Sequence, residues 1–286
     1  MSLTTFLNLK EVRIKFKTEF PKPVLEINSK ILAEPFTNNY VLVGSAFDYL
    51  LRFYLQRLNG AKTIHSEWVA SSVVARYQNR MKQKGFNNAS SPTYIKTDLE
   101  IMTGIHNKAK EAHRLYLKNG LVTDQLLGCA YGLAQIDHFF RSGYIDPNLG
   151  HVQEKDMKDL KNLLLVAKNT NIKAKVCVLN PTFGQASQLV CGADTDLILD
   201  NTIVDIKTTK FLELTRDQYN QLIGYYCLYK LGGIDGLTKR HKIKSLGIYY
   251  SRFGKLATFS VEEFEKSSKF IPFLKWFKKT AKMVFK

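Results

Sequence analysis

Two β-rich runs joined by a two-residue turn constrain the fold of this chain more than any other feature. The first run covers residues 196–199, the second covers residues 202–207, and Asp200-Asn201 lies between them. Asp and Asn tolerate positive φ, which favours a tight hairpin turn. Counting outward from that turn, the register predicts that Asp196 faces Asp205 on the neighbouring strand.

The side chains of such a hairpin alternate between the two faces of the sheet. One face receives an apolar set, and the other receives a charged set: Leu197, Leu199, Val204 and Ile206 against Asp194, Asp196, Asp205 and Lys207. The same register places Lys207 opposite Asp194. Taken alone, that pair is best explained as a cross-strand salt bridge.

The facing pair of aspartates is unusual for a hairpin that has only a structural role. Directly opposed Cβ atoms lie about 4.5–5.5 Å apart, and like charges there are destabilising. Two carboxylates at that separation repel by roughly 3 kcal/mol at an effective dielectric constant of about 20. A divalent cation would replace this repulsion with coordination, and oxygen ligands suit Mg²⁺ or Mn²⁺. The hairpin therefore predicts a metal site on Asp196 and Asp205, with Asp194 as a second candidate for the first ligand.

The remaining pattern predicts an α/β protein in which helices precede most of the strands. Apolar periodicity and capping residues predict a short N-terminal helix and an extended arm over 1–35, then helices from near Gly44 and over about 97–120, 124–141, 154–168 and 215–232, and a last helix after Ser260 that is kinked at Pro272. Strands are expected at 175–179, 196–199, 202–207, 246–250 and 256–259. We divide the chain into 1–60, the arm and first core helix; 61–169, a helical insertion; and 170–286, the core that holds these strands.

The chain carries a large excess of positive charge. It has 42 Lys and Arg against 25 Asp and Glu, a net charge of +17, and residues 201–286 hold 17 of the basic residues against 7 of the acidic ones. Such a field concentrates polyanions, which favours a nucleic-acid partner over a merely solvated basic surface. Charge alone does not separate DNA, RNA and an anionic membrane.

Composition excludes several classes of protein. A hydrophobic fraction of 45% and a charged fraction of 23% are close to globular averages, so a disordered chain is excluded. No apolar stretch approaches the length of a membrane span, and the N-terminus lacks a signal pattern. The four cysteines form no Cys-x-x-Cys pair, which argues against a zinc ribbon or a disulfide framework. We therefore expect a cytoplasmic protein that does not act at a membrane.

The charged hairpin resembles the core signature of the PD-(D/E)XK nuclease superfamily, in its RecB-like branch. That signature is an Asp that opens one strand and an Asp or Glu followed by x-Lys in the next; here it reads Asp196-Leu197 and Asp205-Ile206-Lys207. Upstream, Gly44-Ser45-Ala46-Phe47-Asp48 is similar to the helix that supplies another ligand, usually His or Glu, with Asp48 at that position. Downstream, Gln221-Leu222-Ile223-Gly224-Tyr225 is similar to the Gln-x-x-x-Tyr motif of RecB-like nucleases.

The resemblance implies a restriction-endonuclease-like core, with a mixed β-sheet flanked by helices, to which the helical insertion is added. It implies that Mg²⁺ or Mn²⁺ is held by Asp48, Asp196, Asp205 and the backbone carbonyl of Ile206. It also implies catalytic roles for Asp196, Asp205, Lys207, Gln221 and Tyr225. Lys207 would position the water or neutralise the phosphate, and Gln221 and Tyr225 would position the DNA strand.

The expected function is the hydrolysis of DNA phosphodiester bonds by Mg²⁺-activated water. Two alternatives stay open: a catalytically degenerate nucleic-acid-binding module of the same fold that acts with a partner, and an RNA-directed nuclease. A protein partner or a homo-oligomer also stays open. Asp48 is equally well explained as a helix cap in Ser45-x-x-Asp48, and Gln221 with Tyr225 as a buried polar pair. His106 and His113, seven residues apart on one expected helix, receive no role.

Overall fold

The computed structural model describes residues 2–60, 63–65, 67–83, 93–170 and 172–285. Its helices are α1 (Leu3–Leu7), α2 (Lys10–Glu19), α3 (Tyr40–Asn59), α4 (Val69–Gln83), α5 (Thr93–Asn119), α6 (Asp124–Ser142), α7 (Glu154–Asn169), α8 (Arg216–Gly232), α9 (Glu262–Lys266) and α10 (Phe270–Val284). Its strands are β1 (Thr63–His65), β2 (Cys177–Leu179), β3 (Leu197–Leu199), β4 (Thr202–Lys207), β5 (Ser245–Tyr250) and β6 (Lys255–Ser260). Two 3₁₀ helices are η2 (Gly184–Val190) and η3 (Ser251–Phe253). None of the described helices is both long and apolar enough to cross a bilayer.

The described strands form one mixed sheet in the order β1-β2-β3-β4-β5-β6. β1 runs parallel to β2 and β4 runs parallel to β5, whereas the other neighbouring strands are antiparallel. The expected α/β fold with a mixed sheet and flanking helices is confirmed. The sequence pattern did not predict β1, because three residues within a largely helical segment carry too little alternation. Only its pairing with β2 identifies it as a strand.

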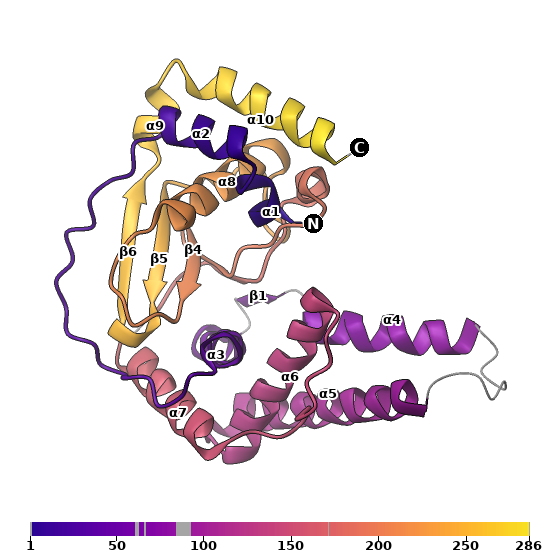
Figure 1. Cartoon of the computed structure of the whole chain (residues 1–286). Coiled ribbons are helices and arrows are strands. Elements are labelled where there is room, and N and C mark those ends of the chain that lie inside the picture. Colours follow the sequence, from indigo (N-terminus) through magenta and orange to yellow (C-terminus); the bar gives the residue numbers. More distant parts are fainter. Residues whose placement is uncertain (1, 61–62, 66, 84–92, 171, 286) are drawn as a thin grey trace.

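Helices cover both faces of this sheet (Figure 1). On one face, Leu197, Leu199 and Val204 join a hydrophobic core to which α3 to α7 contribute. On the other face, Ile198 and Ile203 join a second core with α1, α2, α8 and α10. In Figure 1, α3 to α7 lie in the lower part of the molecule, and α1, α2, α8 and α10 lie in the upper part. The predicted alternation of the hairpin is therefore confirmed on its apolar face.

Three helix boundaries differ from their predicted places, the first being the start of α3 at Tyr40 rather than near Gly44. The last helix is not kinked at Pro272; the chain leaves the helix after α9 and starts α10 at Phe270, so that Pro272 is the third residue of a new helix. A proline in the first turn removes no helical hydrogen bond, because the first N–H groups have no partner in the helix. α5 begins at Thr93 rather than at Thr97, so the Thr97-x-x-Glu100 pattern lies inside a helix instead of capping one.

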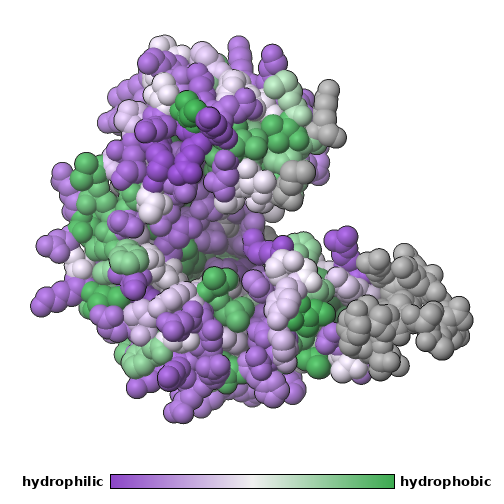
Figure 2. Space-filling view, in the orientation of Figure 1, coloured by the Kyte–Doolittle hydropathy of each residue, from purple (hydrophilic) through white to green (hydrophobic). Residues whose placement is uncertain are grey.

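A hollow separates the upper and lower parts of the molecule. Figure 2 shows that it opens toward the right of the view and that hydrophilic residues line much of it. One point where the two parts meet is the start of α3, because Gly44 packs beside Thr208, the residue that follows β4. The N-terminal part of α3 and the end of β4 are therefore neighbours.

Candidate active site

The hairpin of β3 and β4 forms with the predicted register. Leu199 pairs with Thr202, Ile198 with Ile203 and Leu197 with Val204. Asp200 has a φ of 50°, the positive value that the turn was expected to need. Its Oδ1 also accepts hydrogen bonds from the N–H groups of Lys175 and Val176, at 2.7 and 3.0 Å. The turn is therefore tied to the beginning of β2, and the positions of the hairpin residues are fixed.

Asp196 lies just beyond the last pair of this ladder, one residue before β3. Its carboxylate turns toward β4, where Oδ2 accepts a hydrogen bond of 2.6 Å from the N–H of Ile206. Its backbone carbonyl accepts a second hydrogen bond of 2.8 Å from the N–H of Asn180, which follows β2. Asp196 is thus held from both neighbouring strands, with its carboxylate next to the Asp205-Ile206-Lys207 segment.

Asp205 and Lys207 lie on one face of β4, as their spacing of two predicts. The Nζ of Lys207 is 2.7 Å from Oδ2 of Asp205, whose side chain is 4% exposed. Lys207 does not pair with Asp194, which was the expected cross-strand partner; Asp194 instead forms a β-bridge with Thr182. Burial disfavours the charge of Lys207, but attraction to Asp205, its ion-pair partner, and to Asp196 outweighs burial and raises the pKa of Lys207.

Gln221 and Tyr225 of α8 extend this arrangement. Lys207 Nζ donates a hydrogen bond to Oε1 of Gln221 at 3.2 Å, and Nε2 of Gln221 donates to the hydroxyl of Tyr225 at 2.7 Å. The Tyr225 ring stacks on Phe183 with a centroid distance of 5.7 Å. Burial, followed by the charges of the nearby aspartates, raises the pKa of Tyr225 well above its usual value, so the hydroxyl stays protonated. The two α8 residues therefore form one connected chain with Lys207.

Asp48 approaches the hairpin from α3. It does not cap this helix, because α3 begins at Tyr40 and Ser45 and Asp48 lie inside it. The cap interpretation is wrong because nothing between Tyr40 and Gly44 interrupts the helix. Oδ2 of Asp48 accepts a hydrogen bond from Nη2 of Arg52 at 2.5 Å, one helical turn onward. Oδ1 is buried and has no hydrogen-bond partner within the described residues.

Burial and neighbouring carboxylates raise the pKa values of two aspartates of this site, Asp48 and Asp196. Burial raises the pKa of Asp196 well above its usual range, and the charges of Asp205 and Asp48 raise it further. Burial also raises the pKa of Asp48; Arg52 opposes this effect and Asp194 adds to it. Such effects require the carboxylates to be close in space. The charges of Asp194, Asp196, Asp205 and Asp48 therefore act within one region near the end of β4.

The residues present supply the oxygen ligands that a Mg²⁺ or Mn²⁺ site needs, although their side chains do not form a complete set of ligands around one point. Among the described residues, no three His, Cys, Asp or Glu side chains are grouped as ready-made metal ligands. Arg52, Lys207 and the Ile206 N–H each contact one carboxylate instead. Oδ1 of Asp48 nonetheless stays buried without a hydrogen-bond partner among the described residues, and burial is the main cause of the raised pKa of Asp196. Hard divalent cations prefer such oxygen donors.

Sequence reasoning missed the support that α6 gives to Arg52. The guanidinium of Arg52 lies over the ring of Tyr49 at 4.5 Å, and the hydroxyl of Tyr49 donates a hydrogen bond of 2.9 Å to Oδ1 of Asp137 in α6. Asp137 is 8% exposed, and burial raises its pKa to about 6 despite this hydrogen bond and the charge of Arg52. The sequence signal that could have indicated this contact is an acidic residue in a largely apolar helical turn, Ala134-Gln135-Ile136-Asp137.

Replacing Asp137 with Asn is expected to stabilise the protein at neutral pH. The folded-state pKa of Asp137 is raised, so its contribution to stability is present below about pH 4 and is lost as the pH rises through about 6. Asn keeps the acceptor for Tyr49 and removes the buried charge. A shift of this size corresponds to about 2–3 kcal/mol. Urea unfolding at neutral pH should show this gain, which should shrink at about pH 4. An equal gain in stability at both pH values would show that the raised pKa of Asp137 is not its cause.

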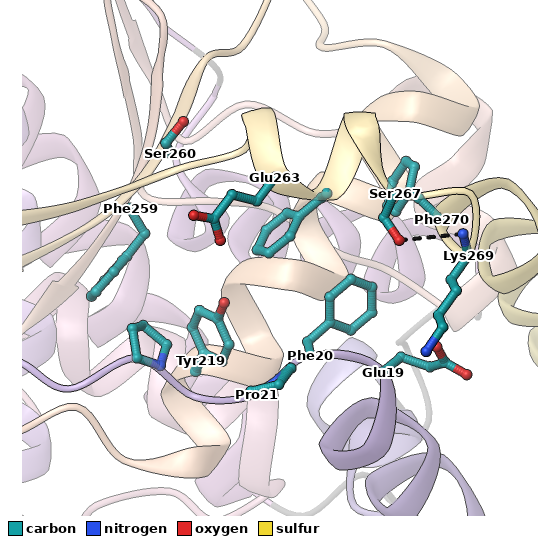
Figure 3. A pocket seen from close by; sticks show the side chains of 12 residues that line it. Glu19, Phe20, Pro21, Tyr219, Phe259, Ser260, Glu263, Ser267, Lys269 and Phe270 are labelled. Atoms are coloured by element: carbon teal, nitrogen blue, oxygen red, sulfur yellow. Dashed lines mark hydrogen bonds between the residues drawn. The ribbon is translucent and has the colours of Figure 1, made fainter.

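Two further cavities differ in whether candidate site residues line them. One of about 180 Å³ is lined by Lys207 and Gln221 together with residues of α1 and the start of α8. Another, of about 390 Å³, lies between the N-terminal arm, α8 and α9, and no candidate site residue lines it. Figure 3 shows Phe20, Tyr219 and Phe259 directed toward its interior. Phe20 also packs edge-to-face on Phe264 at 5.2 Å, so this wall belongs to the second core.

Comparison of the chain with protein-family models, with curated proteins and with solved structures finds no match.

Proposed function

We propose that this protein is a metal-dependent nuclease that hydrolyses the phosphodiester bonds of DNA. The observation that carries the proposal is the contact of Asp205 with Lys207 on one face of β4, beside the carboxylate of Asp196. Asp48, Gln221 and Tyr225 adjoin these residues from helices before and after the hairpin. The mixed sheet with α3 on one face and α8 on the other is the arrangement expected of a restriction-endonuclease-like core.

Mg²⁺ or Mn²⁺ would be held by Asp48, Asp196 and Asp205, with the carbonyl of Ile206 as a further ligand. When bound, such an ion lowers the pKa of a water and offsets charge on the phosphate. Arg52 would hold Asp48 in place, and the Ile206 N–H would hold Asp196. These contacts fix the orientation of the carboxylates before any ligand binds, which reduces the cost of binding.

Lys207 supplies a positive charge for the phosphate or for the attacking water. Its pKa is raised, so the ammonium stays protonated at neutral pH. Gln221 holds the ammonium through Oε1, and Tyr225 in turn holds the amide group of Gln221. Tyr225 stays protonated and keeps a hydroxyl proton that it can donate to a phosphate oxygen. These three residues therefore form a positively charged, hydrogen-bonding edge beside the carboxylates.

The main alternative is a nucleic-acid-binding module of the same fold. The Arg52–Asp48 contact favours it, because it compensates the charge of one expected ligand without any metal. Cleavage assays separate the two functions. The nuclease should cut linear, circular or single-stranded DNA in Mg²⁺ or Mn²⁺ and lose this activity in EDTA. Binding with no cleavage of any DNA or RNA in either metal would establish the module, and cleavage of RNA alone would establish an RNA-directed nuclease.

Binding of DNA is expected to weaken steeply as the salt concentration rises. The net charge of +17 makes phosphate contacts the main source of affinity. Each phosphate contact on duplex DNA changes the slope of log K against log salt by about −0.9. Fluorescence anisotropy in EDTA at several salt concentrations measures this slope. A flat response between low and physiological salt would contradict a phosphate-dominated interface.

A further inference from the structure

A second cavity adjoins the carboxylates on the side of the helical insertion. It has a volume of about 400 Å³ and lies where α3, α4, α5 and the end of β2 meet. The lining residues that matter here are Arg52, Gln56, Trp68, Lys110, His113 and Leu179. A volume of this size suits a small organic ligand or one unit of a larger one.

Two structural links join this cavity to the candidate active site. Arg52 lines the cavity and also donates the hydrogen bond to Asp48. On the opposite side, Leu179 lines the cavity and pairs with Leu197, the residue after Asp196. The residue after Leu179 is Asn180, whose N–H donates to the carbonyl of Asp196. Arg52 and the β2–β3 pairing therefore connect the lining of this cavity with Asp48 and Asp196.

Stacked aromatic rings form one wall of the cavity. The rings of Phe53 and His113 stack with a centroid distance of 4.2 Å and an interplanar angle of 28°. The indole of Trp68 lies 5.4 Å from each of them. Trp68 is only partly buried and lines the cavity, so the ligand can contact its indole. The indole is tilted by 43° to the Phe53 ring and by 57° to the His113 ring, so it offers a stacking face of its own. Aromatic faces of this kind bind nucleobases by stacking, with little dependence on the identity of the base.

Polar and charged groups complete the lining, in which two cationic side chains accompany one acidic side chain, that of Glu67. Arg52 and Lys110 supply positive charge beside the aromatic wall, and the amide of Gln56 supplies a hydrogen-bond donor and an acceptor. An aromatic surface flanked by cations is the combination that binds single-stranded nucleic acid. A base in duplex DNA is stacked between its neighbours and is not free to enter such a cavity.

We propose that this cavity receives one unstacked base of a single-stranded DNA segment whose backbone runs past Asp48, Asp196 and Asp205. The proposal rests on the proposed function for the direction of the strand, and it extends that function by naming single-stranded DNA as the substrate class. Trp68 is the stacking surface, and Lys110 contacts a flanking phosphate, while Arg52 stays paired with Asp48. The helical insertion thereby gains a role in the choice of substrate.

The experiment uses the fluorescence of Trp68 in the metal-free protein. The chain has two tryptophans, and Trp276→Phe removes the other one, which lies in α10. In EDTA, a short single-stranded DNA oligonucleotide should quench the emission of Trp68. An abasic oligonucleotide of equal length should bind through its phosphates without quenching it. A blunt duplex should quench it less than the single strand does.

A variant series adds an affinity measurement to this test. In the wild-type background, Trp68→Ala should weaken binding of the single strand about tenfold, the effect of one lost stacking contact. Trp68→Phe keeps an aromatic ring and should bind nearly as well as the wild type. Neither change should alter binding of the abasic strand or the salt slope, because the phosphate contacts stay. Circular dichroism of both variants checks that they are folded.

The outcomes separate this proposal from the proposed function. Base-dependent quenching in a protein that cuts nothing in Mg²⁺ or Mn²⁺ would support the base cavity and contradict the nuclease. Metal-dependent cleavage without base-dependent quenching would support the nuclease and overturn the base cavity. An equal loss of affinity for the abasic strand in the folded Trp68→Ala variant would also overturn it, as would equal quenching by duplex and single strand.

Discussion

Replacing Asp205 with Asn, or Lys207 with Met, is expected to reduce metal-dependent cleavage of DNA by at least about 10²–10³-fold. Asn removes the negative charge that would hold the cation, and Met removes the positive charge beside the phosphate. Both residues lie 2.7 Å apart in the same network, so the two effects should not add independently. The measurement is the single-turnover rate constant with saturating enzyme, because it isolates the chemical step from binding.

Lys210, three residues after Lys207, provides the matched control. Lys210 is exposed beyond the end of β4 and contacts the ring of Phe211 rather than a carboxylate. Lys210→Met removes the same charge as Lys207→Met, so both variants should show a similar small loss of affinity for DNA in EDTA. Only Lys207→Met should lose cleavage. Unchanged turnover in the folded Asp205→Asn and Lys207→Met variants would show that the active site lies elsewhere.

The hairpin was predictable from the sequence because its determinants are local. The Asp200-Asn201 turn and the apolar alternation on either side of it fix the register without any distant contact. The capping box of Thr215 and Gln218 at the start of α8 was predictable for the same reason. β1 was not, because a three-residue strand depends on a partner that lies more than a hundred residues away.

The candidate site was predictable as a set of residues but only partly as a set of contacts. Period-two alternation correctly places Asp205 and Lys207 on one face, yet it does not say that the Lys207 ammonium contacts Asp205 instead of Asp194. That choice depends on where the chain leaves the ladder before Asp196. The link from Arg52 through Tyr49 to Asp137 joins two helices far apart in the sequence, so no local pattern indicates it.

Replacing Asp159 with Asn is expected to destabilise the fold by about 3–5 kcal/mol, because it removes one partner of a buried ion pair. Nη1 and Nη2 of Arg252 lie 2.7 and 2.9 Å from the two carboxylate oxygens of Asp159, and both side chains are at most 1% exposed. Nη1 also donates to the carbonyl of Ala33 at 3.0 Å. The pair therefore joins α7, the β5–β6 connection and the N-terminal arm, which together position the sheet against the helices below it.

Urea unfolding at constant pH measures the loss as a lower midpoint with an unchanged slope. Lys161→Ala is the matched control, because Lys161 lies on the same helix as Asp159, and its exposed ion pair with Asp124 of α6 should be worth no more than about 1 kcal/mol. The double variant Asp159→Leu with Arg252→Met should be more stable than Asp159→Asn, because it leaves no buried charge without a partner. If Asp159→Asn cost as little as Lys161→Ala, this pair would not hold the helices to the sheet, and the position of α3 beside β4 would have to depend on apolar packing alone.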